Sequence, residues 1–287
     1  MALTIYELSH LPQFNQPIYI LGSFEAFHLG HYELLKSAQS LTANSQRDLV
    51  LVFFADCEHL PKNQTIFSDL NFRAQAFADL NFEHAIALNY QHLAHWNPQE
   101  FIDALVANQT NVDFVCGEDF RFGFRASGSP ATLKDRFGAD KVHVVSQLKV
   151  ANKKISTTLL KESLEQGEIE LVNNLNMYKY GFSASFTTTS EQEFLVTKAD
   201  DLVNLKHGVY IVNVEIGEFV YYAVLKYQYN TQAWIKFLDF NFNIDILVNC
   251  TIQFIKALRF FDTTAEVITK QDLIEAKNFF ISITKTK

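Results

Sequence analysis

The first half of the chain alternates short apolar runs with amphipathic segments, and this alternation limits the possible folds more than any other feature. The apolar runs lie at 18–21, 49–54, 85–88, 113–116 and 142–145. Segments with the spacing of helices lie between them, at 32–41, 71–80 and 98–107. Strands that alternate with helices form βαβ units, so the pattern predicts a parallel sheet covered by helices on both faces. Such sheets bind ligands at the carboxyl ends of their strands.

The pattern changes near residue 180. Two helical segments precede the change, at 157–166 and 168–174. Residues 182–193 are rich in Ser and Thr, and we expect a linker or irregular segment there. Strand-like runs follow at 208–214, 219–227, 233–240 and 246–258, with a hairpin turn at 215–218 and a helix over 265–280. Several strands followed by one helix predict a small antiparallel barrel, so we expect two domains, 1–180 and 181–287.

Charge and cysteine content restrict the class of protein. The 287 residues carry a formal net charge of −8, which argues against a general nucleic-acid binder. Three widely spaced cysteines predict reduced thiols rather than disulfides or a metal site. The first residues lack a signal-peptide pattern, and no apolar stretch is long enough to span a membrane. We therefore expect a cytoplasmic protein without membrane or nucleic-acid partners; the sequence leaves its oligomeric state open.

The strongest motif is the segment 22–31, which follows the first predicted strand and opens the first predicted helix. Gly22 and Gly30 allow a ligand to approach the backbone closely. The helix start presents unpaired N–H groups and a partial positive charge. His28 and His31 lie three positions apart, so both imidazoles can face one phosphate. A helix cap and a packed turn would be a simpler explanation for a lone histidine, but the HxGH pattern in this position favours a nucleotide site.

A second segment, 117–123, follows the fourth predicted strand and combines two glycines, two acids, an arginine and two aromatic residues. On residue types alone, the simpler interpretation is a turn in which Phe120 and Phe122 fill core space and Arg121 pairs with Glu118 or Asp119. The alternative is a site for a flat aromatic ligand that carries a phosphate.

A third segment, 155–161, places hydroxyl side chains at a predicted helix start, followed by Lys161. Ser and Thr there are typical of an N-cap. The same helix start with a nearby lysine can also hold a polyphosphate.

Together these three segments resemble the bifunctional riboflavin kinase/FMN adenylyltransferases of bacteria. That family carries GxFDGxHxGH-like, GxDFxFG-like and ISSTxIR-like segments in the same order, and residues 167–170 and 178–180 also resemble the stretch that closes its first domain. The resemblance covers the whole chain and is strongest over 17–180. The departures are Glu25 for the usual Asp, Ala26 for Gly, and Leu159 and Lys161 for arginines. Lys161 keeps the positive charge but lacks the bidentate geometry of an arginine.

The resemblance implies a Rossmann-like α/β nucleotidyltransferase domain with a parallel sheet, followed by a small antiparallel β-barrel domain with a C-terminal helix. It also implies transfer of AMP from ATP to FMN, which gives FAD and pyrophosphate, with Mg²⁺ accompanying ATP and no metal bound by the protein's own residues. His28 and His31 would act on the α-phosphate. The ATP contacts would be Gly22, Ser23, Phe24, Glu25, Gly30, Ser156, Thr157, Thr158 and Lys161. The flavin contacts would be Asp119, Phe120, Arg121 and Phe122.

The second domain departs further from the family's kinase domain. The chain has no PTxN motif, and the nearest candidate for that loop, 181–186, lacks its Pro, Thr and Asn. The family's catalytic glutamate lies five residues before an aspartate that corresponds to Asp239, which places Trp234 at that position. An indole cannot accept a proton from a hydroxyl group. We therefore expect riboflavin kinase activity to be lost, unless a different strand register brings Glu215 or Glu218 to that position.

Two other functions stay open. One is another HxGH nucleotidyltransferase that acts on a different small phosphate. The other is a flavin- or nucleotide-binding protein without catalysis, for which the departures at Glu25 and Lys161 are the relevant features.

Overall fold

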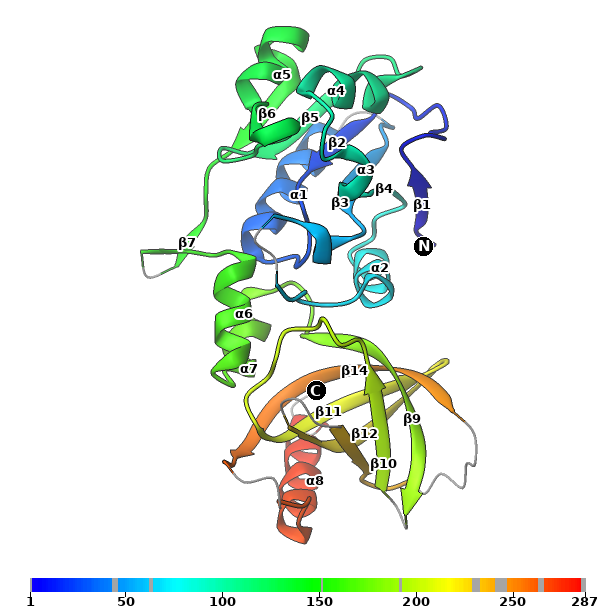
Figure 1. The fold of residues 1–287 in the computed structure, drawn as a ribbon, viewed down its shortest axis with the longest axis vertical. Coiled ribbons are helices and arrows are strands. Elements are labelled where there is room, and N and C mark those ends of the chain that lie inside the picture. The colour runs from blue at the N-terminus through cyan, green and yellow to red at the C-terminus, as the bar shows by residue number, and fades with distance from the viewer. Residues whose placement is uncertain are drawn as a thin grey trace. The chain divides into compact units, whose positions relative to one another are not determined.

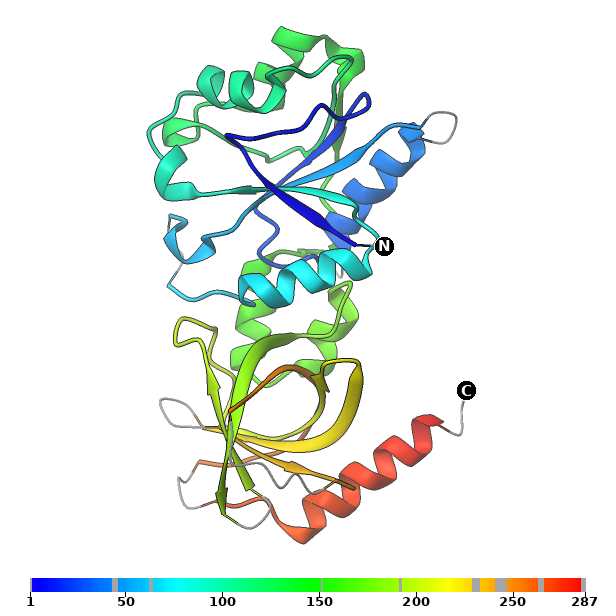
Figure 2. The ribbon, with the colours of Figure 1, turned by 90° about the vertical axis from the view of Figure 1, so that its right-hand side faces the viewer.

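The computed structural model describes residues 2–42, 46–61, 64–150, 152–190, 193–228, 233–240, 247–262 and 266–284. The chain forms two compact units (Figures 1 and 2). The sheet unit comprises 1–66 and 73–156, and the barrel unit comprises 67–72 and 157–287.

The sheet unit contains six parallel strands in the order β1-β4-β3-β2-β5-β6. The strands are β1 (Thr4–Glu7), β2 (Ile18–Leu21), β3 (Leu49–Phe54), β4 (His84–Leu88), β5 (Asp113–Gly117) and β6 (Val142–Val145). The chain proceeds from β2 to β3 and β4 on one side, and then places β5 and β6 on the other side of β2. In open α/β sheets, such a reversal marks the place where ligands bind, beyond the carboxyl ends of the central strands. The predicted α/β class and parallel sheet are confirmed.

Helices connect these strands: α1 (Leu29–Thr42), α2 (Leu70–Asp79), α3 (Tyr90–Leu93), α4 (Pro98–Val106) and α5 (Pro130–Phe137). The start of α4 follows directly from its sequence. The Asn97 side chain accepts hydrogen bonds from the first turn, the Glu100 carboxylate accepts one from the Asn97 backbone N–H, and Pro98 occupies the first helical position. The helix then buries Phe101, Ile102 and Leu105 in the core of the sheet unit.

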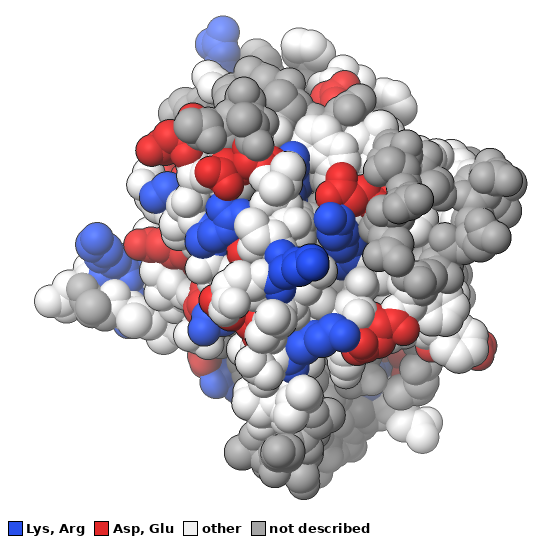
Figure 3. Space-filling view, turned by 90° about the horizontal axis from the view of Figure 1, so that it is seen from below, with Lys and Arg blue, Asp and Glu red and all other residues white. Residues whose placement is uncertain are grey.

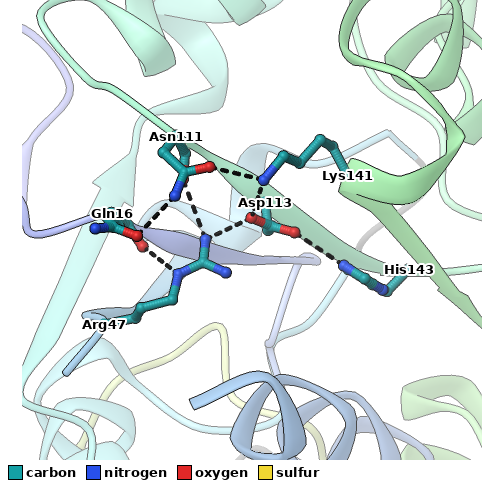
Figure 4. A network of polar contacts seen from close by, with 6 residues as sticks. All are labelled: Gln16, Arg47, Asn111, Asp113, Lys141 and His143. Carbon is teal, nitrogen blue, oxygen red and sulfur yellow. Dashed lines mark hydrogen bonds and ion pairs between the residues drawn. The ribbon is translucent and has the colours of Figure 1, made fainter. Parts of the chain in front are cut away.

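A polar network joins the amino ends of the central strands (Figure 4). The buried carboxylate of Asp113 accepts hydrogen bonds from Arg47 at 2.5 Å, His143 at 3.0 Å and Lys141 at 3.3 Å. Burial alone would raise the pKa of Asp113, but the hydrogen bonds from His143 and Arg47 outweigh it, so the pKa lies below its ordinary value. This network ties β5 to β6 and to the segment before β3, at the edge of the sheet opposite to the ligand-binding edge.

The barrel unit contains a closed antiparallel barrel in the order β10-β13-β12-β11-β14-β9. Its strands are β9 (Gly181–Ser190), β10 (Glu193–Lys198), β11 (Gly208–Ile216), β12 (Phe219–Tyr227), β13 (Ala233–Phe237) and β14 (Val248–Phe260). The predicted hairpin turn joins β11 to β12, where Gly217 adopts a φ of 58°. A short hairpin of β7 (Lys149–Val150) and β8 (Lys153–Lys154) belongs to the sheet unit.

The expectation of a linker over 182–193 is wrong, because β9 forms most of that segment. Phe182 and Phe186 are buried, and Phe182 packs on Phe254 of β14. The three Thr residues that follow Phe186 fit an extended strand, since β-branched Thr has a high strand propensity. Residues 191–192 lie outside the described residues.

Three helices belong to the barrel unit: α6 (Thr157–Glu165), α7 (Ile169–Leu175) and α8 (Lys270–Thr284). Asn173 of α7 donates to the carbonyl of Phe254 at 2.9 Å and accepts from the Tyr180 backbone at 2.8 Å, so α7 is held against β14. Helix α8 buries Ala276 and Phe280 against Val209 and Val224 of the barrel. The predicted barrel with a C-terminal helix is confirmed; Ile246 and Ala265, the predicted starts of the last strand and helix, lie outside the described residues.

The cysteine side chains are buried, and charged side chains of both signs lie on the surface. Cys57, Cys116 and Cys250 are buried and form no disulfide bond among the described residues, and burial raises the pKa of Cys116 and of Cys250 to about 12. Basic and acidic side chains lie interspersed on the face shown in Figure 3. No helix within the described part of the chain has the length and apolar character needed to cross a bilayer.

Candidate functional site

The loop after β2 contains the predicted phosphate-binding motif. It begins at Gly22, where an added Cβ would lie 2.9 Å from the ring of Phe24, so the loop needs glycine there. Phe24 has a φ of 47°, which is costly for a residue with a side chain. Its ring stacks on Phe27 and meets His31 edge-on at 4.8 Å. The loop is therefore held in a strained conformation by aromatic packing, as is common at functional sites.

His28 and His31 come together at the start of α1. Their rings are stacked, with 3.7 Å between centroids and 13° between planes. Nδ1 of His31 lies 2.9 Å from the Ala26 carbonyl, which can only accept, so the neutral His31 carries its proton on Nδ1. The backbone N–H of His31 donates to Nδ1 of His28 at 3.3 Å, so the neutral His28 carries its proton on Nε2. His28 can thus donate to an oxygen while neutral, whereas Nε2 of His31 can donate only after protonation.

Burial keeps both imidazoles neutral in the free protein. It lowers the pKa of His28 from 6.5 to about 4, and the nearby ammonium group of Lys154 contributes to the shift. Burial also lowers the pKa of His31 well below its ordinary value, and the charge of His28 adds to that effect. An entering phosphate would reverse this balance, because a nearby anion favours the protonated form of an imidazole.

A cavity of about 390 Å³ opens at the carboxyl ends of the strands, and Gly22 belongs both to this cavity and to the HxGH loop. The described residues of its wall are mostly apolar and aromatic, and they include two arginines and no acidic side chain. The lining residues are Leu21, Gly22, Val52, Phe54, Leu60, Pro61, Leu88, Tyr90, Leu93, Ala94, Trp96, Phe101, Phe120, Arg121, Phe122, Gly123, Arg125 and Ala126. A cavity of this size and composition suits a flat aromatic ligand.

The segment 117–123 contributes three of its predicted residues to this cavity: Phe120, Arg121 and Phe122. Phe120 and Phe122 stack on each other at 5.4 Å and also pack on the core, so the core and ligand interpretations are both compatible with their positions. The suggested pairing of Arg121 with Glu118 or Asp119 is wrong. Arg121 donates to the Phe120 carbonyl, and the structure pairs Asp119 with Lys154 instead, away from the cavity wall.

Two buried residues at this edge of the sheet were not predicted. Asp56 accepts hydrogen bonds from the backbones of Tyr90 at 2.7 Å and Gln91 at 3.2 Å, and so fixes α3 and the Tyr90 wall of the cavity. Arg73 of α2 donates to one carbonyl in the HxGH loop and to two carbonyls at and just after the end of β3. Neither residue belongs to a recognisable motif. Tyr90 and Trp96 could have been found, because they follow a predicted strand and so belong to its carboxyl end.

The remaining predicted residues occupy different parts of the chain. In the HxGH loop, the Ser23 carbonyl accepts from the Phe54 backbone at 3.3 Å, Glu25 is 5% exposed, and a Cβ at Gly30 would lie 3.1 Å from the His28 ring. Ser156 ends the sheet unit. Thr157, Thr158 and Lys161 lie in the first two turns of α6, in the barrel unit. Within the described ranges, no three His, Cys, Asp or Glu side chains are grouped so as to hold a metal ion.

Comparisons with a family model and with individual proteins point to the same family. A sequence model of the FAD synthetase family matches residues 12–159. The bifunctional riboflavin kinase/FMN adenylyltransferase of Listeria monocytogenes is 23% identical over 73% of this chain and 71% of its own length. The corresponding protein of Bacillus subtilis is 24% identical over 75% and 73%, and the chloroplastic FAD synthetase 1 of Arabidopsis thaliana is 27% identical over 67% and 61%.

Among solved structures, a protein of Streptococcus pneumoniae described as a macrolide-efflux protein matches 96% of this chain and 98% of its own, with a TM-score of 0.78. At 19% identity, this likeness shows the fold alone.

Proposed function

The chain belongs to the FAD synthetase family, and from that premise we propose that it adenylylates FMN at the HxGH loop while its barrel unit has no riboflavin kinase activity. The observation that carries the first part is the stacked pair of His28 and His31, in the same unit as an aromatic cavity that shares Gly22 with the loop. The family's substrates are ATP and FMN, and its product is FAD.

In the proposed reaction, an oxygen of the FMN phosphate attacks the α-phosphorus of ATP. The new bond forms as the bond to the oxygen between the α- and β-phosphates breaks, and pyrophosphate leaves. No side chain becomes covalently attached, so the contribution of the protein is positioning and charge stabilisation. His28 donates from Nε2 to a phosphate oxygen, and His31 becomes a second donor when the anion raises its pKa.

The other assignments follow the chemistry of each group. The aromatic cavity binds the isoalloxazine ring between Phe120, Phe122, Tyr90 and Trp96, with Arg121 at its wall. Gly22, Ser23, Phe24, Glu25 and Gly30 form the nucleotide loop, and Ser156, Thr157, Thr158 and Lys161 provide hydroxyl and ammonium donors for the triphosphate. Mg²⁺ enters bound to the ATP phosphates, the usual mode for this ion.

The proposed loss of kinase activity rests on the surroundings of Trp234. It lies on β13 opposite Lys226 of β12, and the Lys226 ammonium group lies 3.9 Å from the centre of the indole ring. Neither the Trp234 indole nor the Lys226 ammonium group can accept a proton at this position. Two glutamates were alternative candidates for the catalytic base. The Glu215 carboxylate accepts a hydrogen bond from Gln253 at 2.9 Å, and Glu218 lies in the turn between β11 and β12.

One assay tests the adenylyltransferase. Purified protein is incubated with MgATP and FMN, and the products are separated by chromatography; FAD and pyrophosphate should form in equal amounts. FAD absent from a folded sample would contradict the proposal. Parallel incubations with other small phosphate esters distinguish a nucleotidyltransferase with another acceptor, and binding of FMN and ATP without turnover would indicate a non-catalytic binding protein.

A further inference from the structure

Two buried or nearly buried arginines lie at opposite ends of the parallel strands. One of them forms an ion pair with a carboxylate, and the other hydrogen-bonds to backbone carbonyls. Arg47 precedes β3, at the amino ends of the strands, and its side chain is 11% exposed. It donates to the carbonyls of Gln16 at 2.8 Å and Asn111 at 3.1 Å, and its charge is neutralised by Asp113 at 2.5 Å (Figure 4). This arrangement is that of an ordinary structural ion pair.

Arg73 lies at the carboxyl ends of the strands and is 1% exposed. Its guanidinium group donates to the carbonyls of Phe54 at 2.9 Å and Ala55 at 2.8 Å, and more weakly to that of Phe24 at 3.4 Å. Nε of Arg73 has no hydrogen-bond partner. In the described part of the chain, no carboxylate forms an ion pair with it.

A buried charge without a counter-ion is costly, and proteins normally pair such groups. The carbonyl dipoles around Arg73 compensate only part of that cost. The Phe24 carbonyl belongs to the HxGH loop itself, and the carbonyls of Phe54 and Ala55 lie at the end of β3 and directly after it. Phe24, one of the acceptors, is also the loop residue with a positive φ. The guanidinium group therefore lies under the segment that would receive the anionic part of a nucleotide.

We infer that Arg73 is a positioning residue for the phosphates of ATP: it fixes the Phe24 carbonyl and supplies a buried positive charge that the incoming phosphates neutralise. This inference rests on the proposed function, because it requires ATP to bind at the HxGH loop. At an effective dielectric constant of about 20, a unit charge about 10 Å from a phosphate changes its binding constant roughly tenfold.

The test compares Arg73→Met, Arg73→Lys and the matched control Arg47→Met in the full chain. The dissociation constant of MgATP is measured by calorimetry without FMN, that of neutral adenosine by NMR, and stability by thermal unfolding. We expect Arg73→Met to weaken MgATP binding about tenfold and to change adenosine binding little. Arg73→Lys should retain MgATP affinity within about threefold, because it keeps the charge. Arg47→Met should lower the unfolding temperature and leave MgATP affinity unchanged.

Unchanged MgATP affinity in folded Arg73→Met would overturn the inference, and so would an equal loss of adenosine affinity or an equal effect of Arg47→Met. If Arg73→Met does not fold, Arg73→Lys decides: a tenfold loss of MgATP affinity in that variant would exclude the role of the charge. The outcome is separate from that of the FAD assay, because wild-type protein that binds MgATP but forms no FAD would refute the proposed reaction and leave this comparison intact.

Discussion

At the scale of single residues, the His28–His31 pair dominates the proposed chemistry. If both imidazoles meet the same phosphate, His28→Ala or His31→Ala should each lower the turnover of FAD formation by roughly a hundredfold or more, the scale of a lost charge-stabilising donor. The unfolding temperature should change little. His10→Ala is the matched control, since His10 is exposed and its ring lies against Ser9. Turnover close to that of the wild type in either variant would remove the assignment.

The buried pair should also make the free protein sensitive to acid. The unfolded chain takes up a proton on His28 near pH 6.5, whereas the folded site resists protonation until about pH 4. Between these values the unfolded state binds more protons, so the free energy of unfolding should fall as the pH is lowered from about 6.5 to 4. We expect His28→Gln to show a shallower fall in denaturant titrations over this range. In NMR titrations, the imidazole pKa of His28 should rise when ATP is added; a value near 6.5 without ligand would contradict the burial argument.

Sequence reasoning found this pair because its members are neighbours in the chain, between a strand and a helix. Asp56 and Arg73 escaped it for a physical reason. A carboxylate that caps residues 90 and 91, or a helical arginine that reaches three carbonyls, becomes meaningful only when tertiary folding brings distant segments together. Nothing in the local sequence separates such groups from ordinary surface charges.

At the scale of elements, the loop 117–128 forms one wall of the cavity. The conformation of this loop requires a glycine at position 123. Its φ is 72°, and an added Cβ would lie 2.8 Å from the Pro98 backbone. Gly217 has a similar φ of 58° but open space around it, so it is a matched control for backbone strain alone. Gly217→Ala should cost about 1–2 kcal/mol of stability and leave FMN affinity unchanged.

Gly123→Ala adds a collision to that strain, and the neighbouring Phe122 must move with the loop. We expect its FMN affinity, measured by quenching of flavin fluorescence, to fall several-fold beyond any effect of Gly217→Ala. Equal FMN affinity in the two variants would separate this loop from the flavin site.

The elements themselves were largely predictable. The five apolar runs of the sheet unit became strands because parallel strands covered by helices need largely apolar sequence, as the fully buried β2 shows most clearly. Strand β9 was missed because its many Ser and Thr residues resemble a linker, although the buried Phe182 and Phe186 lie within it. Strand β1 was also missed. It is an edge strand paired with β4, and its first two residues are exposed, so its sequence lacks the continuous apolar run of the other strands.

At the scale of the whole molecule, the HxGH loop and the aromatic cavity lie in the sheet unit, whereas Trp234 and residues 181–186 lie in the barrel unit. Supplied with riboflavin, MgATP and no FMN, the protein should form neither FMN nor FAD, because Trp234 cannot act as a base and the PTxN loop is missing. The same sample given FMN should form FAD, which shows that it is folded and active. Robust FMN production from riboflavin would mean that another residue serves as the base.

The buried cysteines make it possible to measure how often each of the two units unfolds. Cys57 and Cys116 lie in the sheet unit and Cys250 lies in the barrel unit. Thiol reagents attack the thiolate, and burial suppresses that form of Cys116 and Cys250 in the native state, while the side chain of Cys57 is shielded by its burial. Modification must therefore wait for local or global unfolding. The rate at which each cysteine is alkylated, read by mass spectrometry of its peptide, reports how often its own unit opens, without an engineered probe.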